Sequence, residues 1–191
     1  MVKINQINPK PASICAIDAS TNSLAFASFN RNDLEAMGKI EFRGASTYEK
    51  VADAAAKTQA FFDSYGVPDA IVIEHTVFIN SPKTAADLAL VQGAMLGAMS
   101  VAGVKKIKSI NPIAWQTFIG NGRLSKEEKK MIRDETPGKS DSWYKAQERE
   151  WRKQRTIHFV EIQYDKFILD NDVADAIGIG HYALHNWDKL N

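Results

Sequence analysis

The chain has little of what marks secreted or membrane proteins. Among 191 residues it has one cysteine, Cys15, which excludes an internal disulfide and favours a reducing compartment. No unbroken apolar run is long enough to cross a bilayer. Residues 1–12 lack the apolar core of a signal peptide. We therefore expect a cytoplasmic protein with no membrane partner.

An excess of either charge is also missing. The chain has 24 Lys and Arg residues against 23 Asp and Glu residues, a formal net charge of +1. This balance neither favours nor excludes nucleic acid as a partner, so any basic surface must be local. The length fits one compact domain. We expect a flexible lead-in over residues 1–12 and a single domain over residues 13–191.

Two short apolar runs each end in an acid. Residues 14–18 end in Asp18, and residues 70–74 end in Glu74. Apolar runs without alternation are typical of strands that are buried on both faces. Two such strands would bring Asp18 and Glu74 to one edge of a sheet. Because like charges repel, a divalent cation is the usual means of holding such a pair.

A second pair of acids opens the predicted last helix, which would run from its cap Asn171 to about residue 187. Asp172 and Asp175 are three residues apart, so they share a face, and we place both in the first turn. Small residues would let this helix lie close against the sheet: Ala174, Ala176, Gly178 and Gly180. Taken singly, each acid has an ordinary structural interpretation. Asp172 and Asp175 could cap the helix, Asp18 could accept hydrogen bonds from turn amides, and Glu74 could form a salt bridge with the basic segment. Their joint occurrence favours one shared site.

The order of the predicted elements indicates an α/β fold. Strands are expected near residues 14–18, 24–29 and 38–43, then a helix capped by Thr47, a strand at 70–74, a helix at 83–102 and a strand at 106–110. A short helix follows Pro112, and the spacing of Ile157, Val160, Tyr164 and Phe167 is helical. This order predicts a mixed five-stranded sheet, an antiparallel meander plus parallel strands, flanked by helices.

The acids in this order resemble those of the RuvC family of Holliday-junction resolvases, in the ribonuclease H-like superfamily. The pattern is an Asp ending the first strand, a Glu ending the fourth, and Asp-x-x-Asp-Ala opening the last helix. Phe78 after Glu74, residues 86–93, the Asn111-Pro112 pair and the glycine turn at 120–122 are similar too. The resemblance covers residues 14–184. It implies a ribonuclease H-like fold and a homodimeric endonuclease that cuts four-way junctions and other branched DNA.

The resemblance also implies roles for these residues. Asp18, Glu74, Asp172 and Asp175 would be catalytic and would hold two Mg²⁺ ions, for which Mn²⁺ would substitute. Carboxylates without His or Cys suit Mg²⁺, and two ions about 4 Å apart serve phosphodiester hydrolysis. The family has a catalytic lysine after the glycine turn. Lys126 matches its distance from that turn, whereas Lys153 matches its distance from the following helix, and we favour Lys153.

Residues 123–155 depart from the bacterial members and resemble the longer phage versions, as a basic helical insertion. Its cations and the aromatic residues among them could track a DNA backbone and stack on bases. They could equally form a solvated helical face with its Trp residues packed inward. The predicted DNA contacts are Phe78, Lys83, Lys126, Lys129, Lys130, Arg149, Arg152, Lys153 and Arg155.

Two features of the helices have alternative interpretations. The helix at 83–102 is apolar on most of its surface, and Gly93 and Gly97 would allow a partner helix to approach closely. It could instead be buried within the chain. His181 and His185 are four residues apart, but no third residue has zinc-ligand spacing, so a packing role is favoured.

Two other functions compete with the nuclease interpretation. A non-catalytic junction- or RNA-binding module would keep the basic segment without needing all four acids. A sugar-kinase or actin-like ATPase also begins with a strand that ends in Asp, but it needs a glycine-rich phosphate loop after that strand. Residues 19–22 lack glycine, which argues against the ATPase.

Overall fold

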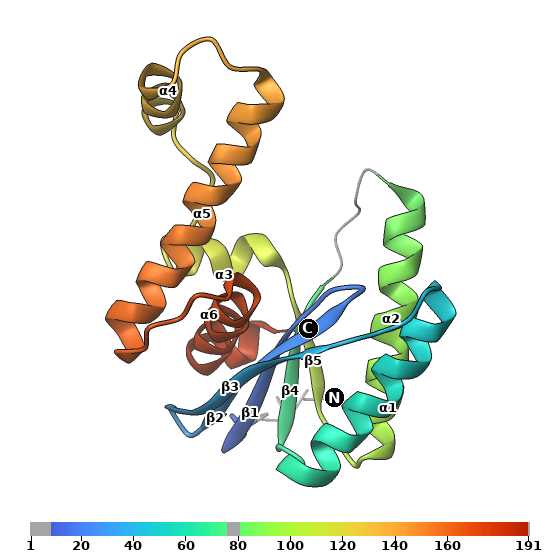
Figure 1. The fold of residues 1–191 in the computed structure, drawn as a ribbon. Coiled ribbons are helices and arrows are strands. Elements are labelled where there is room, and N and C mark those ends of the chain that lie inside the picture. The colour runs from blue at the N-terminus through green and yellow to red at the C-terminus, as the bar shows by residue number, and fades with distance from the viewer. Residues whose placement is uncertain (1–8, 76–80, 191) are drawn as a thin grey trace, which may run out of the picture.

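A five-stranded mixed sheet lies between two layers of helices in the computed structural model, which describes residues 9–75 and 81–190 (Figure 1). The strands are β1 (Ser13–Ala19), β2 (Ser23–Asn30), β3 (Asp33–Glu41), β4 (Ala70–Glu74) and β5 (Ile107–Ile110). Their order in the sheet is β3-β2-β1-β4-β5. The first three strands are antiparallel, and β4 and β5 continue the sheet parallel to β1. The predicted meander with parallel strands is confirmed.

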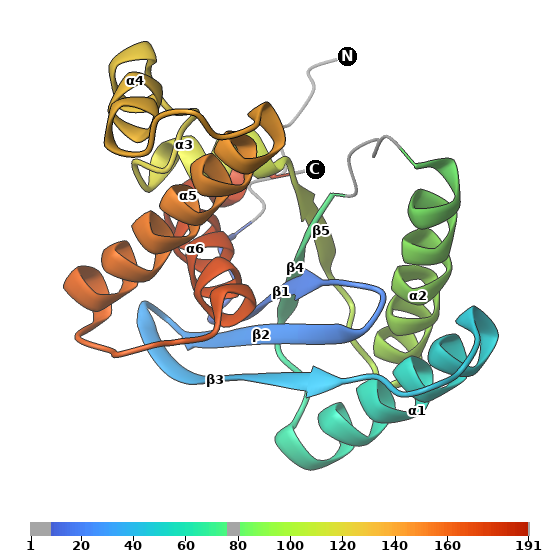
Figure 2. The same ribbon diagram turned by 45° about the horizontal axis from the view of Figure 1, so that its top comes forward.

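The helices divide between the two faces of the sheet (Figure 2). Helices α1 (Thr47–Tyr65) and α2 (Pro82–Val101) cover one face, where Phe62 and Met95 pack on Ile17 and Ile71. The other face is covered by α3 (Pro112–Phe118), the inner part of α5 (Asp141–Tyr164) and α6 (Asn171–Asn186). A short turn of 3₁₀ helix, Trp187–Lys189, follows α6. The sheet thus separates two hydrophobic cores, one beneath each layer of helices.

Helix α6 lies unusually close to the elements beneath it because two of its residues have no side chain. A Cβ atom on Gly180 would overlap the ring of Phe29 on β2. A Cβ atom on Gly178 would lie 2.8 Å from the ring of Trp115 on α3. The expectation that small residues bring this helix close to the sheet is therefore confirmed.

Helix α4 (Lys126–Glu135) and the outer part of α5 form an arm that projects from the sheet (Figure 1). Buried Ile132 and Tyr144 join the two helices, and the guanidinium carbon of Arg133 lies 4.3 Å from the centre of the Tyr144 ring. Ion pairs add to this packing: Lys129–Glu148, Arg133–Asp141 and Arg155–Glu128. The arm is therefore held together by its own contacts.

Three helix-end predictions are wrong in detail. Helix α5 ends at Tyr164, because Asp165 adopts a left-handed conformation (φ 52°), so Phe167 lies outside the helix and is 79% exposed. The cap of α6 is Asp170, which accepts hydrogen bonds from the next backbone amides, rather than Asn171. Likewise Ser46, not Thr47, caps α1. Ser46 and Asp170 have the extended backbone conformation of an N-cap, and Asp165 has the left-handed conformation that ends a helix.

Helix α2 is apolar enough, and long enough, to cross a membrane by composition alone, with a mean hydropathy of 1.3. One such helix is weak evidence for a membrane protein. Val91, Met95 and Met99 are fully buried against α1 and the sheet. Leu90 and Val101 remain exposed, so within the described residues α2 keeps an uncovered apolar side.

Candidate active site

Asp18 and Glu74 lie side by side at one edge of the sheet. Strands β1 and β4 are parallel and pair Ile17 with Ile73, so the next residues along both strands are also neighbours. Side chains alternate between the faces of a strand. Ala16 and Val72, two residues earlier, belong to the core beneath α6. The carboxylates of Asp18 and Glu74 therefore point to the α6 side.

The beginning of α6 brings the other two acids to the same place. The pKa of Asp18 is raised well above its ordinary value by burial, and then by the negative charges of Asp175, Glu74 and Asp172. Such coupling requires that all four groups lie near one another. Asp172 is in the first turn of α6, but Asp175 is one turn further along. Our placement of both in the first turn was wrong, so the helix dipole favours Asp172 alone.

Asp175 and Glu74 each have an uncharged hydrogen-bond partner from another element. Burial, with the charge of Glu74 next in importance, raises the pKa of Asp175 to about 7, whereas a hydrogen bond with Thr156 of α5 acts in the opposite direction. Burial also raises the pKa of Glu74. The indole Nε1 of Trp115 donates a hydrogen bond of 2.6 Å to Glu74 Oε2. Thr156 thus orients the buried carboxylate of Asp175, and Trp115 orients that of Glu74.

Asp172 is held by a lysine that the sequence analysis missed. The Nζ atom of Lys39, on β3, lies 2.5 Å from Asp172 Oδ2 and 3.1 Å from Asp170 Oδ2. The residues are more than 130 positions apart in the chain, and no local pattern connects them. Only the placement of β3 next to β2, at the sheet edge beside α6, brings them together.

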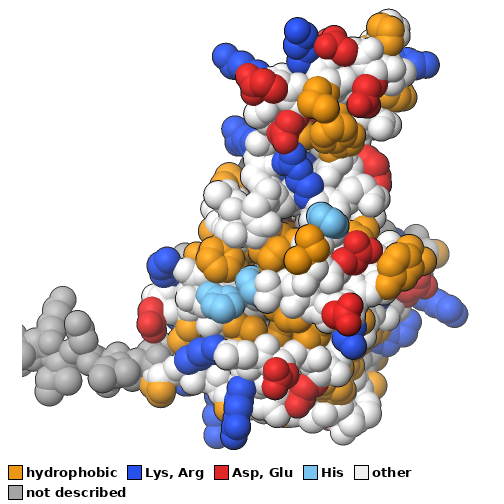
Figure 3. All heavy atoms as spheres, turned by 90° about the vertical axis from the view of Figure 1, so that its left-hand side faces the viewer, with side chains coloured by type: hydrophobic (Ala, Val, Ile, Leu, Met, Phe, Trp, Pro, Cys, Tyr) orange, Lys and Arg blue, Asp and Glu red, His pale blue; other side chains and the backbone are white. Residues whose placement is uncertain are grey.

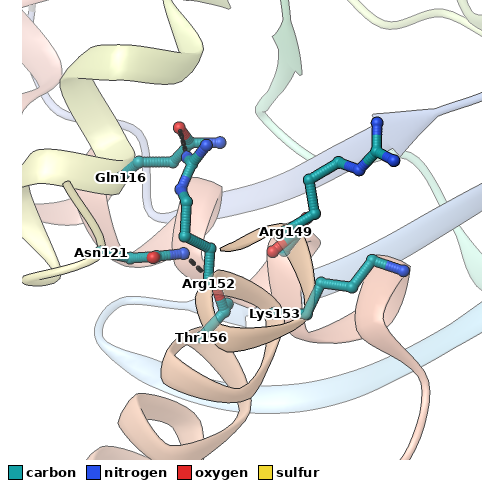
Figure 4. A pocket seen from close by; sticks show the side chains of 7 residues that line it. Gln116, Asn121, Arg149, Arg152, Lys153 and Thr156 are labelled. Carbon is teal, nitrogen blue, oxygen red and sulfur yellow. Dashed lines mark hydrogen bonds between the residues drawn. The ribbon is translucent and has the colours of Figure 1, made fainter. Parts of the chain in front are cut away.

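A hollow of about 160 Å³ opens beside Asp175, between α3, α5 and α6. Arg149, Lys153 and Arg152 line it from α5 (Figure 4). Arg152 turns toward α3 and donates a hydrogen bond to Gln116, whereas Arg149 and Lys153 point to the other side (Figure 4). Of the two candidate lysines, Lys153 lines this hollow and Lys126 does not.

Solved structures of Holliday-junction resolvases have a fold similar to that of this chain. A structure of Thermus thermophilus RuvC aligns with 93% of this chain and 96% of its own, at 15% identity and a TM-score of 0.61. The complex of the same protein with a Holliday junction substrate gives a TM-score of 0.60 at 15% identity, covering 91% of this chain and 96% of the other. The yeast mitochondrial Holliday junction resolvase Ydc2 aligns with 94% of this chain and 80% of its own, at 10% identity and a TM-score of 0.53.

The chain has the RuvC fold. No protein-family model and no curated protein sequence matches this chain at a significant level. At these low identities the likeness to RuvC concerns the fold, and it confirms the predicted ribonuclease H-like architecture. The roles of individual residues must rest on the chemistry of this chain.

On this RuvC-like fold, most of the predicted DNA-binding cations lie along the arm. Lys129 and Arg155 are engaged with Glu148 and Glu128, whereas Lys126 and Lys130 are exposed. Side chains of both charges alternate over the arm (Figure 3). Lys83, at the start of α2, pairs with Asp87, and Phe78 lies outside the described residues. The arm is thus a surface of mixed charge, although most of its cations are exposed.

The four acids suit a hard divalent cation in donor type and charge. Among the described residues the Asp18 carboxylate accepts no hydrogen bond, although it is crowded by three other acids. Within residues 9–75 and 81–190, no three His, Cys, Asp or Glu side chains are close enough to hold a metal ion as they stand. The ammonium group of Lys39 already places one positive charge next to Asp172. The residues therefore fit Mg²⁺ provided that Lys39 gives way or the side chains close in.

The histidines of α6 take part in packing. The Tyr164 hydroxyl and His181 Nδ1 form a hydrogen bond of 2.8 Å, and burial lowers the pKa of His181 to about 4. The rings of His181 and His185 lie 4.6 Å apart against Phe118. A neutral His181 among aromatic rings agrees with the packing role that the sequence analysis favoured.

Proposed function

We propose that this protein is a metal-dependent endonuclease that cuts four-way DNA junctions, and other branched DNA, by hydrolysis of a phosphodiester bond. The observation that carries the proposal is the convergence of Asp18, Glu74, Asp172 and Asp175 at one sheet edge. Four acids gathered from three elements destabilise one another unless a cation offsets them. The likeness of the fold to a RuvC structure bound to a Holliday junction supports the choice of substrate.

In this proposal the four carboxylates hold two Mg²⁺ ions, or Mn²⁺ in their place. When bound, such a pair supplies an activated water and stabilises the leaving oxygen. Trp115 fixes the orientation of Glu74, and Thr156 does the same for Asp175. Arg152 and Lys153 place positive charge beside Asp175, where the phosphate gains negative charge in the transition state. Lys153 is our choice for the catalytic lysine.

We further propose that the protein acts as a homodimer in the cytoplasm, with α2 at the dimer interface. Within the described residues, α2 buries only Val91, Met95 and Met99 within its own chain. Gly93 and Gly97 have open space at the position of a Cβ atom. A four-way junction needs two symmetric cuts, and a two-fold dimer supplies two active sites in that relation.

The test of the proposed function separates binding from cleavage. A synthetic four-way junction, labelled on one strand, is incubated with the wild-type protein and with Asp18→Asn or Glu74→Gln. We expect Mg²⁺-dependent nicking by the wild type, loss of more than about a thousandfold in each variant, and unchanged junction binding. Asp134→Asn, an exposed acid on the arm, serves as the matched control and should cut normally.

Two outcomes would refute the assignment in different ways. Cleavage that survives Asp18→Asn would show that the metal site lies elsewhere. Junction binding without any Mg²⁺- or Mn²⁺-dependent nicking by the wild type would favour the non-catalytic binding module instead. A linear duplex of equal length, included throughout, reports whether the activity depends on branching.

A further inference from the structure

The acids of α6 separate two hollows of the surface. Asp175 lines the hollow under α5, which contains Arg149 and Lys153. Asp172, on the neighbouring turn of α6, lines a second and larger groove of about 560 Å³ on the side of β3. Residues three apart on a helix are close neighbours. The two hollows therefore approach each other at the proposed catalytic acids.

The second groove is built from the segments that follow β1 and β3. Its walls come from the β1–β2 turn, the end of β3 with the loop after it, and the start of α1, which contribute Ser20, Asn22, Ser23, Arg43, Gly44 and Lys50. The β1–β2 turn directly follows Asp18 in the chain. It is a compact turn, in which the Ser20 hydroxyl accepts hydrogen bonds from the amides of Asn22 and Ser23. The groove floor is thus continuous with the end of β1 that presents Asp18.

Two cations of this groove remain available to a ligand. Lys39 also lines it but is already paired with Asp170 and Asp172. Lys50 Nζ donates a hydrogen bond of 2.5 Å to the side-chain oxygen of Asn22, an uncharged partner that leaves the ammonium charge in place. Arg43 is exposed, and its guanidinium forms no ion pair with a described residue. Two acids line the groove with them, the exposed Glu41 and the Lys39-paired Asp172. Asp53, whose carboxylate accepts a hydrogen bond from the Arg43 backbone amide, lies beside the groove and is paired with Lys57.

We propose that the cleaved DNA strand runs through both hollows, and that Arg43 and Lys50 bind its phosphates on one side of the scissile bond while Arg149 and Lys153 bind on the other. This inference rests on the proposed nuclease function. A strand laid across the acids needs positive charge on both sides, because each phosphate is negative and affinity follows the number neutralised. Neither Arg43 nor Lys50 belongs to the arm or to the predicted DNA contacts.

The experiment uses the Asp18→Asn protein, so that binding is measured without cutting. Arg43→Gln and Lys50→Met are combined, because both keep most of the side-chain stem while removing the charge. Affinity for the four-way junction is measured across a series of salt concentrations. Since two phosphates would no longer be neutralised, we expect weaker binding and a logarithmic salt slope that is shallower by roughly 1.4 to 1.8.

The matched control removes two charges at the opposite end of the parallel strands. Lys105 and Lys106 are exposed residues just before β5, and they line a different hollow with Pro68 and Asp69. Lys105→Gln with Lys106→Met changes the net charge equally and should leave the salt slope unaltered. Glu41→Gln should act in the opposite sense and strengthen junction binding.

A second measurement tests direct binding rather than overall charge. Single phosphates near the cut site are replaced by neutral methylphosphonates. Neutralising a phosphate that the groove binds should weaken binding by the Asp18→Asn protein but should not further weaken binding by the protein that also carries Arg43→Gln and Lys50→Met. If the phosphate replacement weakens binding by the same factor with and without Arg43→Gln and Lys50→Met at every position tested, the strand path is refuted although the nuclease function stands. If the unmodified protein neither binds nor nicks the junction, the proposed function itself has failed.

Discussion

Trp115 joins α3 to the end of β4 through the 2.6 Å hydrogen bond from its indole Nε1 to Glu74. Glu74 is otherwise a largely buried carboxylate whose pKa is raised by that burial. We predict that Trp115→Phe lowers the rate of junction cleavage by about tenfold, because hydrogen bonds to charged groups contribute about 1.5–3 kcal/mol. Junction binding should be unaffected. Single-turnover cleavage at saturating protein measures the effect.

Trp187→Phe is the matched control for that variant. Trp187 is also buried, but its Nε1 has no hydrogen-bond partner among the described residues. Both variants shrink a buried ring, and only one removes a bond to an acid. Equal losses of cleavage in the two proteins would mean that Trp115 acts through packing alone.

In the proposed metal site Lys39 would compete with the ion for Asp172, so its removal should tighten metal binding. In Lys39→Met the Asp172 oxygen, now 2.5 Å from Nζ, is released and one positive charge leaves the site. We expect the dissociation constant for Mn²⁺, measured by calorimetry or by electron paramagnetic resonance, to fall several-fold. Lys57→Met, which breaks the Lys57–Asp53 pair, is the control. Weaker Mn²⁺ binding in Lys39→Met would instead show that Lys39 holds Asp172 in position for the ion.

Gly180 is required by the packing of α6 on β2. An added Cβ would overlap the Phe29 ring, which is fully buried. We predict that Gly180→Ala destabilises the fold by about 1–3 kcal/mol, despite the better helix propensity of alanine. Urea unfolding measures it. Gly122→Ala, where nothing lies within 4 Å of the new atom, should change stability little.

Without metal, the stability of the protein should fall as the pH rises. The folded pKa of Asp175 is about 7, above the unfolded value of about 3.9. Its contribution is therefore complete below about pH 4 and is lost as the pH rises through about 7. The raised pKa values of Asp18 and Glu74 act in the same direction. Thermal unfolding in a chelator should give a melting temperature that declines between about pH 5 and about pH 8.

Two comparisons make the pH experiment specific. Asp175→Asn should flatten the decline, because the variant has no proton to lose there. Mg²⁺ should raise the melting temperature more at about pH 8 than at about pH 5, since it binds ionised carboxylates. A decline that persists unchanged in Asp175→Asn would place the responsible group elsewhere.

The sequence was informative where structure follows from short-range pattern. The two apolar runs that end in Asp18 and Glu74 are adjacent parallel strands, and the small residues of α6 permit its close approach. Partners supplied by distant elements could not be predicted. Lys39 and Trp115 reach the acids from β3 and α3, and nothing near them in the chain marks that role. Helix ends were misjudged by one to a few residues because capping depends on backbone conformation.

Helix α5 is one unbroken helix of 24 residues, about 36 Å long, with two very different ends. Near its inner end Thr156 and Val160 are buried, and Thr156 contacts Asp175. Its outer end carries α4 away from the sheet (Figure 1). Since a continuous helix is stiff, a displacement at the tip is transmitted along its length to the residue that orients Asp175. The arm and the hydrogen bond to Asp175 are therefore parts of one rigid element, so a partner that docks on the arm would also bear on the orientation of Asp175.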